Sequence, residues 1–521
     1  MPSRIMADDP NHVINATLGS VYKLILAIPG SNIALTYIKT AYQHDPFRIV
    51  LELFLVFFAL KYMLSKKYKP HDNAVKLTEK EVDDLVEEWQ PEPLVPTLSS
   101  FDKFNLKNSQ QINGPQSVKP KVADHSKPLM NLATTNYLNL VSSEQIRTKA
   151  IETLKNYGVG SCGPPGFYGT IDVHMDLEHD IAQFLGTEQA IIYAQGFSTI
   201  SSVIPAFSKR GDLLVVDEGV NFAVQKGVQI SRSNVRWFKH NDMDDLERVL
   251  EDIRTEDVLH RKRLTRRFIV TEGLFANQGD IAPLDKLLDL KKKFKYRLIL
   301  DESQSIGVLG SRGAGLTDLF NVPATSVDMI VGSMANALCA SGGFCAGNEE
   351  VVDHQRLAGS AYCFSASIPA MLAVSASQAI SIILNQPSLL AELNDRARSF
   401  RVVLANKSLE PLVDIHVGDI ESPSPFFHIR AKLSFLRSRL RDYETEFSRE
   451  DEEQLLQDVV DECAYQGVLT TRAKYVYDQE RACPRPSIKI HVTIGLSKKE
   501  NDKAAGIIKA AIIKSFNKWK K

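Results

Sequence analysis

Short apolar runs alternate with longer amphipathic stretches in the middle of the chain. Five runs have the length and apolar content of buried strands, at residues 190–193, 213–216, 268–271, 298–301 and 329–331. Helical periodicity fills the stretches between them. Buried strands that alternate with helices are typical of a mostly parallel sheet with helices on both faces. The pattern therefore predicts an α/β large domain over residues 131–386.

The pattern changes after residue 386. Two long amphipathic helices and two strands are expected there, at 389–407, 450–466, 426–430 and 488–494. The last residues, 507–521, have the spacing of a basic amphipathic helix. This mixture predicts a second, smaller α+β domain over residues 387–521.

Residues 71–130 show helix signals followed by a polar stretch. Thr78 and Glu81 have the spacing of a capping box, which predicts a helix that continues to about Trp89. Pro91 follows and ends it. Residues 103–128 are polar and rich in lysine, so this region is predicted to be a capped helix and a polar linker.

The most apolar stretch of the N-terminal region is FRIVLELFLVFFALKYML, residues 47–64. A bilayer span needs about 20 such residues, and Arg48, Glu52 and Lys61 interrupt this run. The stretch therefore predicts either one transmembrane helix or a helix that lies in the membrane interface. The first is favoured because four lysines follow the run, at positions 66, 67, 69 and 76.

That excess of lysine predicts an orientation for the membrane-associated region, residues 1–70. Positive residues stay on the cytosolic side, so the bulk of the chain is expected in the cytosol and the N-terminus in the lumen. In that orientation Asn15, which begins an Asn-Ala-Thr sequon, faces the lumen.

Composition narrows the class of protein. The 521 residues include 62 Lys and Arg against 63 Asp and Glu. A general nucleic-acid binder needs a basic excess, so no nucleic-acid partner is expected. The six cysteines form no CxxC pair, and no His/Cys cluster has the spacing of zinc ligands. They predict reduced thiols and no metal site.

Glycine-rich and strand-end motifs follow one another in a fixed order along the large domain: Tyr157–Gly163, Gly166–Thr170, Asp301–Gly310, Gly332–Ala337 and Gly342–Phe344. Each is common by itself, but in this order and spacing they resemble the α-oxoamine synthase family over about residues 131–493. The resemblance implies the fold type I of pyridoxal phosphate (PLP)-dependent transferases. It also implies the condensation of an amino acid with an acyl-CoA.

The resemblance also marks where this chain departs from the family. Asp301 matches the aspartate that pairs with the pyridinium nitrogen of PLP. Asn336 stands at the position of the Schiff-base lysine, and a carboxamide nitrogen is not a nucleophile. No lysine lies between residues 295 and 407. Asn221 and Gln304 replace two histidines of the family pattern, so no catalytic residue is expected in this chain and Asp301 is expected to be vestigial.

Family active sites lie between two subunits, so the resemblance implies a partner that carries the lysine and binds PLP covalently. Cys162, Gly163, Tyr168 and Asn336 are then expected to face the shared site. Ser365 and Ser367 match a segment whose hydroxyls reach the phosphate of the other subunit's cofactor.

Several alternatives stay open. The chain could be a self-sufficient PLP enzyme, or an acyl-CoA or lipid sensor without a catalytic partner. Cys162 could be an ordinary core cysteine, since free cysteines are usually buried. Lys489 either matches the family arginine that holds the substrate carboxylate or is a lysine at a strand edge.

Overall fold

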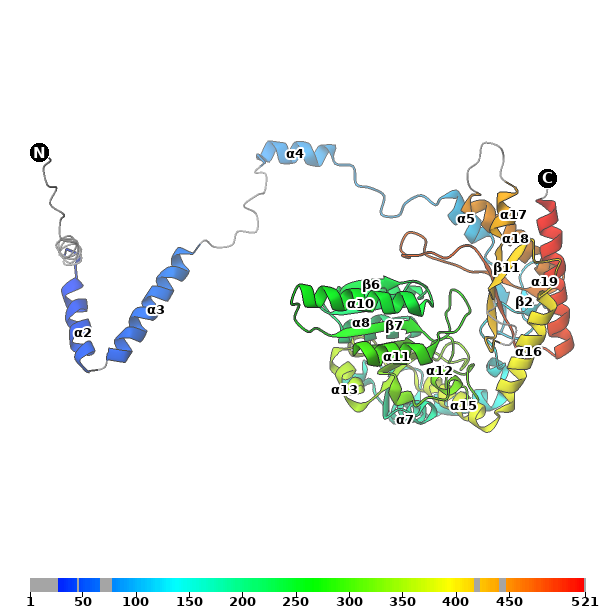
Figure 1. Cartoon of the computed structure of the whole chain (residues 1–521), viewed down its shortest axis with the longest axis horizontal. Helices are drawn as coiled ribbons and strands as arrows, with labels where there is room; N and C mark the ends of the chain where they lie inside the picture. Colours follow the sequence, from blue (N-terminus) through cyan, green and yellow to red (C-terminus); the bar gives the residue numbers. More distant parts are fainter. Residues whose placement is uncertain (1–26, 45, 66–76, 417–421, 440–446, 520–521) are drawn as a thin grey trace, which may run out of the picture. The chain divides into compact units, whose positions relative to one another are not determined.

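The computed structural model describes residues 27–44, 46–65, 77–416, 422–439 and 447–519 (Figure 1). The chain divides into two compact units, residues 1–97 and 98–521, and each is described by itself. Asn15 and the four lysines at 66, 67, 69 and 76 lie outside the described residues.

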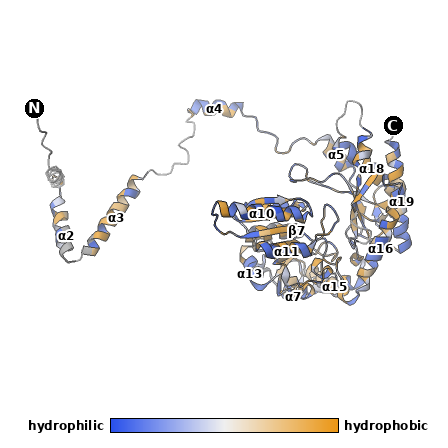
Figure 2. Cartoon of the chain, viewed as in Figure 1, coloured by the Kyte–Doolittle hydropathy of each residue, from blue (hydrophilic) through white to orange (hydrophobic). Residues whose placement is uncertain are grey.

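The first unit contains α2 (Ser31–His44), α3 (Pro46–Leu64) and α4 (Glu79–Glu88). The capping box of α4 is confirmed, because Thr78 Oγ1 accepts from the Glu81 amide and the Glu81 carboxylate accepts from the Thr78 amide. Helix α4 carries more hydrophilic residues than α3 does (Figure 2).

The helix predicted at 47–64 is present as α3, but the structure does not support the prediction that it spans a membrane. No helix among the described residues is long and apolar enough to cross a bilayer. The reason is the charge within its 19 residues, where Arg48, Glu52 and Lys61 occur and the first two form an ion pair of 2.9 Å.

The large domain is built on a seven-stranded sheet in the order β4-β10-β9-β8-β7-β5-β6. All neighbouring strands from β9 to β6 run parallel, and β10 is antiparallel to both of its neighbours. The strands are β4 (Gln189–Tyr193), β5 (Leu213–Asp217), β6 (Asn234–Phe238), β7 (Arg267–Glu272), β8 (Arg297–Asp301), β9 (Met329–Ser333) and β10 (Gly343–Gly347). The five predicted strands and the mostly parallel sheet are confirmed.

Helices cover this sheet, and their apolar sides form one core with it. They include α6 (Glu144–Tyr157), α7 (Asp172–Leu185), α8 (Gly196–Phe207), α9 (Phe222–Ser231), α10 (Met243–Leu259), α11 (Leu284–Phe294), α13 (Glu349–Ala358) and α15 (Ala370–Asn385). The central strands read as continuous apolar runs because both of their faces are buried.

The C-terminal domain has its own core around a four-stranded antiparallel sheet, in the order β11-β12-β15-β14. Its elements are β11 (Val413–His416), β12 (Phe426–Ala431), β14 (Thr471–Arg472), β15 (Ile488–His491), α16 (Ser388–Leu404), α18 (Arg449–Tyr465) and α19 (Lys498–Lys518). The predicted helices and strands are confirmed. The last helix begins at Lys498, after the Ser497 N-cap and nine residues before the predicted start.

The segment predicted as a polar linker packs against this domain. It contains α5 (Ser100–Lys107), and Asn105 Oδ1 accepts a hydrogen bond of 2.9 Å from Arg472. Strand β3 (Met130–Asn131) pairs with β13 (Val468–Leu469). The chain therefore crosses the C-terminal domain before it enters the large one.

Candidate active centre

Acidic side chains meet at the carboxyl edge of the large sheet. Asp217, Glu272 and Asp301 are the last residues of β5, β7 and β8, and all three are buried. Because these strands are parallel, their carboxyl ends share one edge, where ligands of open α/β sheets bind. Glu272 and Asp301 are directly paired in the sheet register.

Asp301 has protein partners at both oxygens. Its Oδ2 accepts from Asn221 Nδ2 at 3.0 Å, and its Oδ1 accepts from the Ser303 amide at 2.9 Å. Burial raises the pKa of the Asp301 carboxyl, while these hydrogen bonds act in the opposite direction. The aspartate expected to be vestigial is thus held by the asparagine that replaces a family histidine.

Glu272 was not singled out from the sequence, although it follows a predicted strand directly. It accepts from the Asn221 amide at 2.5 Å and from the Ala276 amide at 2.9 Å. Burial and the neighbouring Asp301 charge raise the pKa of Glu272 to about 8. A neutral carboxyl at this position lowers the repulsion within the acidic cluster.

Lys489 is not at a sheet edge, because β15 lies between β12 and β14. Its Nζ sits 4.8 Å from the centre of the Phe426 ring. Burial lowers the pKa of Lys489 to about 8, and the charge of Glu272 opposes that shift. The strand-edge interpretation is therefore wrong, and Lys489 belongs to the surroundings of the acidic cluster.

Asn336 is tied back to the chain, since its Nδ2 donates to the Ser303 carbonyl at 2.7 Å. Gln304 Oε1 is buried and has no hydrogen-bond partner among the described residues. These residues do not fit PLP as a covalently held cofactor. Position 336 offers no amine, and the carboxylate that would face the pyridinium nitrogen already has its hydrogen bonds.

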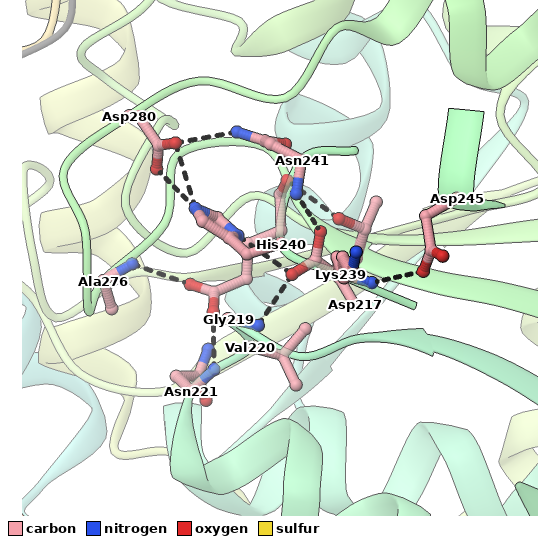
Figure 3. A network of polar contacts seen from close by, with 12 residues as sticks. Asp217, Gly219, Val220, Asn221, Lys239, His240, Asn241, Asp245, Ala276 and Asp280 are labelled. Atoms are coloured by element: carbon pink, nitrogen blue, oxygen red, sulfur yellow. Dashed lines mark hydrogen bonds and ion pairs between the residues drawn. The ribbon is translucent and has the colours of Figure 1, made fainter. Parts of the chain in front are cut away.

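A charged histidine fixes the turn that carries Asn221 (Figure 3). His240 lies between two aspartates, with Nδ1 2.9 Å from Asp217 Oδ1 and Nε2 3.0 Å from Asp280 Oδ2. Burial lowers the pKa of His240, but the hydrogen bonds to Asp217 and Asp280 outweigh it and raise the pKa to about 10. A Cβ atom at Gly219 would lie 2.3 Å from the imidazole, so only glycine allows this approach.

The glycine-rich turn and the serine segment lie against each other. The Ser367 amide donates to the Gly163 carbonyl at 2.9 Å, and Ser161 Oγ donates to the Ser367 carbonyl at 2.8 Å. Ser365 and Ser367 line a cavity of about 20 Å³, room for one water. Ser367 Oγ is buried without a hydrogen-bond partner among the described residues.

The same turn presents side chains to solvent. Cys162 and Tyr168 have left-handed backbones, with φ of 58° and 64°. Cys162 is exposed, so the interpretation as a core cysteine is wrong. Tyr168 is fully exposed, and Phe167 and Phe364 are 67% and 83% exposed. Among the described residues, no hydrogen bond joins this turn to Asn336.

The sequence of this chain is similar to a known protein family and to several known proteins. Residues 127–508 match the family described as aminotransferase class I and II. Serine palmitoyltransferase 1 of Dictyostelium discoideum is 43% identical over 451 residues, which are 86% of this chain and 90% of that protein. Serine palmitoyltransferase 1 of Saccharomyces cerevisiae is 36% identical, with 94% of each chain covered.

A solved serine palmitoyltransferase from S. paucimobilis, with a bound PLP–myriocin aldimine, has a similar structure. The TM-score is 0.67 at 20% identity, and the match covers 80% of this chain and 98% of that one. Together with the family match, this likeness confirms the predicted fold type I of PLP-dependent transferases.

Proposed function

This chain belongs to the aminotransferase class I and II family, and within it to the serine palmitoyltransferase 1 proteins, and we propose that it is the non-catalytic subunit of a serine palmitoyltransferase. With a lysine-bearing subunit 2, it condenses L-serine and palmitoyl-CoA to 3-ketodihydrosphingosine, the first step of sphingolipid synthesis. The names of the relatives support the reaction.

The observation that supports a non-catalytic role is the closed centre, in which Asp301 already has its hydrogen bonds and position 336 offers no amine. Asn221 donates a hydrogen bond to the carboxylate of Asp301, and the side chain of Asn336 has no nucleophilic nitrogen. PLP, held covalently by subunit 2, supplies the electron sink of the reaction. The role of this chain is then to complete the neighbouring site and to exclude water from it.

The exposed turn supports a surface that subunit 2 covers. Cys162, Gly163 and Tyr168 present it, and large apolar side chains that remain exposed mark protein interfaces. The unpartnered Ser367 Oγ, together with Ser365, supports a contact with the phosphate of the partner's cofactor.

We further propose that the complex works at the endoplasmic reticulum membrane with the large unit in the cytosol. The exposed apolar side chains of α3, among them Phe54, Phe57 and Phe58, support a helix in the membrane interface. Six free cysteines are consistent with a reducing compartment. Small membrane subunits, of the Orm type and of the activating type, are the expected regulators.

The first prediction tests which of the two subunits binds PLP. The chain purified alone is expected to show no absorbance band of protein-bound PLP, and the complex with subunit 2 is expected to show one. Borohydride reduction followed by peptide mass analysis should place the pyridoxyl group on a lysine of subunit 2. A pyridoxyl group on this chain would support a self-sufficient enzyme. Failure to recover a PLP-bearing partner from membranes would support the sensor.

The second prediction concerns Asn336→Lys. This single change is not expected to create a PLP site, because Asn221 still holds Asp301 and Gln304 still replaces a histidine. Absorbance and turnover of the isolated variant measure the outcome. The matched control adds Asn221→His and Gln304→His to the same chain. Strong PLP binding with turnover in the single variant would contradict the closed centre.

A further inference from the structure

The edge of the large sheet opposite Asp217, Glu272 and Asp301 carries a band of basic side chains. Strands β7 and β8 are neighbours and begin at this edge. The segments that lead into them, VLHRKRLTRR at 258–267 and LKKKFKYR at 290–297, contain ten Lys and Arg residues and no acidic residue. We call residues 258–267 and 290–297 the basic face. Its ten basic residues produce a strong local positive potential, although the net charge of the whole chain is −1.

Half of these charges have partners in the fold. Lys262 pairs with Glu256, Arg267 with Asp257, Lys291 with Asp328 and Lys293 with Glu247, and Arg266 donates to the Phe207 carbonyl. The other five are exposed and make no hydrogen bond or ion pair within the described parts of the chain. They are Arg261, Arg263, Lys292, Lys295 and Arg297.

Apolar side chains stand among these free charges. Val258, Leu259 and Leu264 are 76%, 74% and 93% exposed. Helix α10 ends at the first two, and the chain turns away at Arg261 with φ of 46°. A groove of about 1280 Å³ opens beside Leu264. Its lining is of mixed charge and includes Arg266, Lys295, Arg297, Glu188, Asp212 and Glu350.

Basic residues mixed with protruding apolar ones are typical of surfaces that bind a lipid interface. A nucleic acid or an acidic protein would pair with the charges. Binding to either one would not explain why Leu264 projects into solvent. We propose that the basic face docks on the surface of an anionic phospholipid membrane, with Leu264 inserted at the headgroup level. Strands of six and five residues, β7 and β8, separate this face from the acidic cluster by about 15 Å, so docking leaves the carboxyl edge free for subunit 2.

The test places a reporter at the most exposed apolar position. Full-length chain carrying Leu264→Trp is mixed with phosphatidylcholine vesicles that contain brominated acyl chains, with or without about 30% phosphatidylserine. The parent chain, with three tryptophans, supplies the background. We expect the added fluorescence to be quenched at least about twofold in the anionic vesicles only, and the quenching to be lost in about 0.5 M salt.

Charge variants assign the effect to the basic face. In the Leu264→Trp background, Arg261→Gln, Arg263→Gln and Lys292→Gln together should remove most of this quenching, because each charge contributes roughly fivefold to the affinity of the basic face for an anionic surface. Lys407→Gln, Lys499→Gln and Lys503→Gln remove the same charge from exposed lysines of the C-terminal domain and should leave quenching unchanged. Quenching that is absent, independent of phosphatidylserine, or equal in both triple variants overturns the proposal. Absence in every vesicle would favour an acidic protein.

Discussion

Alanine at Phe167 or at Tyr168 is expected to weaken the binding of subunit 2 by at least about 30-fold, since buried aromatic anchors of an interface contribute about 2 kcal/mol or more. Both rings project from the glycine-rich turn, and Tyr168 does so from a left-handed backbone. Such a backbone is unfavourable for a bulky residue. A partner that covers the ring of Tyr168 would explain why this ring is fully exposed on an unfavourable backbone conformation.

Close packing at two glycines holds the backbone of the turn in one conformation. A Cβ atom at Gly169 would lie 2.0 Å from the Gly163 carbonyl oxygen, and one at Gly163 would lie 2.7 Å from the Phe167 carbonyl oxygen. The backbone therefore closes on itself without room for side chains. Little conformational entropy remains to be lost when the partner binds.

The dissociation constant of the purified subunits, measured by titration calorimetry, checks this prediction. Tyr465→Ala is the matched control, because Tyr465 is also an exposed aromatic residue, at the end of α18 and outside the turn. Thermal unfolding of each variant alone should be unchanged. Equal affinity of the Phe167, Tyr168 and Tyr465 variants would show that the turn is not the interface.

The order of the elements was predictable because it depends on local patterns. Continuous apolar runs locate the central strands, and the Thr78 capping box locates α4. Strand β10 escaped prediction because glycines at both of its ends lack strand propensity. The span at 47–64 was predicted from apolar content, but three charges within the run keep α3 from meeting the requirement for a bilayer.

The chemistry of the centre was only half predictable. The resemblance locates Asp301 and Asn336 and shows that an amine is missing. It does not show that Asn221 closes the site, because that hydrogen bond joins residues 80 positions apart. The average burial of free cysteines left a core position open for Cys162 as an alternative, yet a left-handed turn exposes it. A contact between distant segments decides the first outcome, and the local backbone conformation decides the second.

His240→Gln is expected to lower the free energy of unfolding by about 3–5 kcal/mol near neutral pH, because it leaves the buried Asp217 charge without its cation. The imidazolium bridges Asp217 and Asp280 and so joins the end of β5 to the loop after β7. Its loss should also loosen the turn that carries Asn221.

The effect should depend on pH with a defined sign. An unfolded histidine has a pKa near 6.5, and the pKa of His240 in the folded chain is about 10. A raised folded pKa gives stability that is complete below about pH 6.5 and is lost as the pH rises through about 10. Denaturant titrations of parent and variant should therefore differ most near pH 6.5 and converge toward pH 10. His179→Gln, at an exposed position of α7, is the control and should change little. A difference that stays constant over this range would mean that packing, rather than the imidazolium charge, holds the two aspartates together.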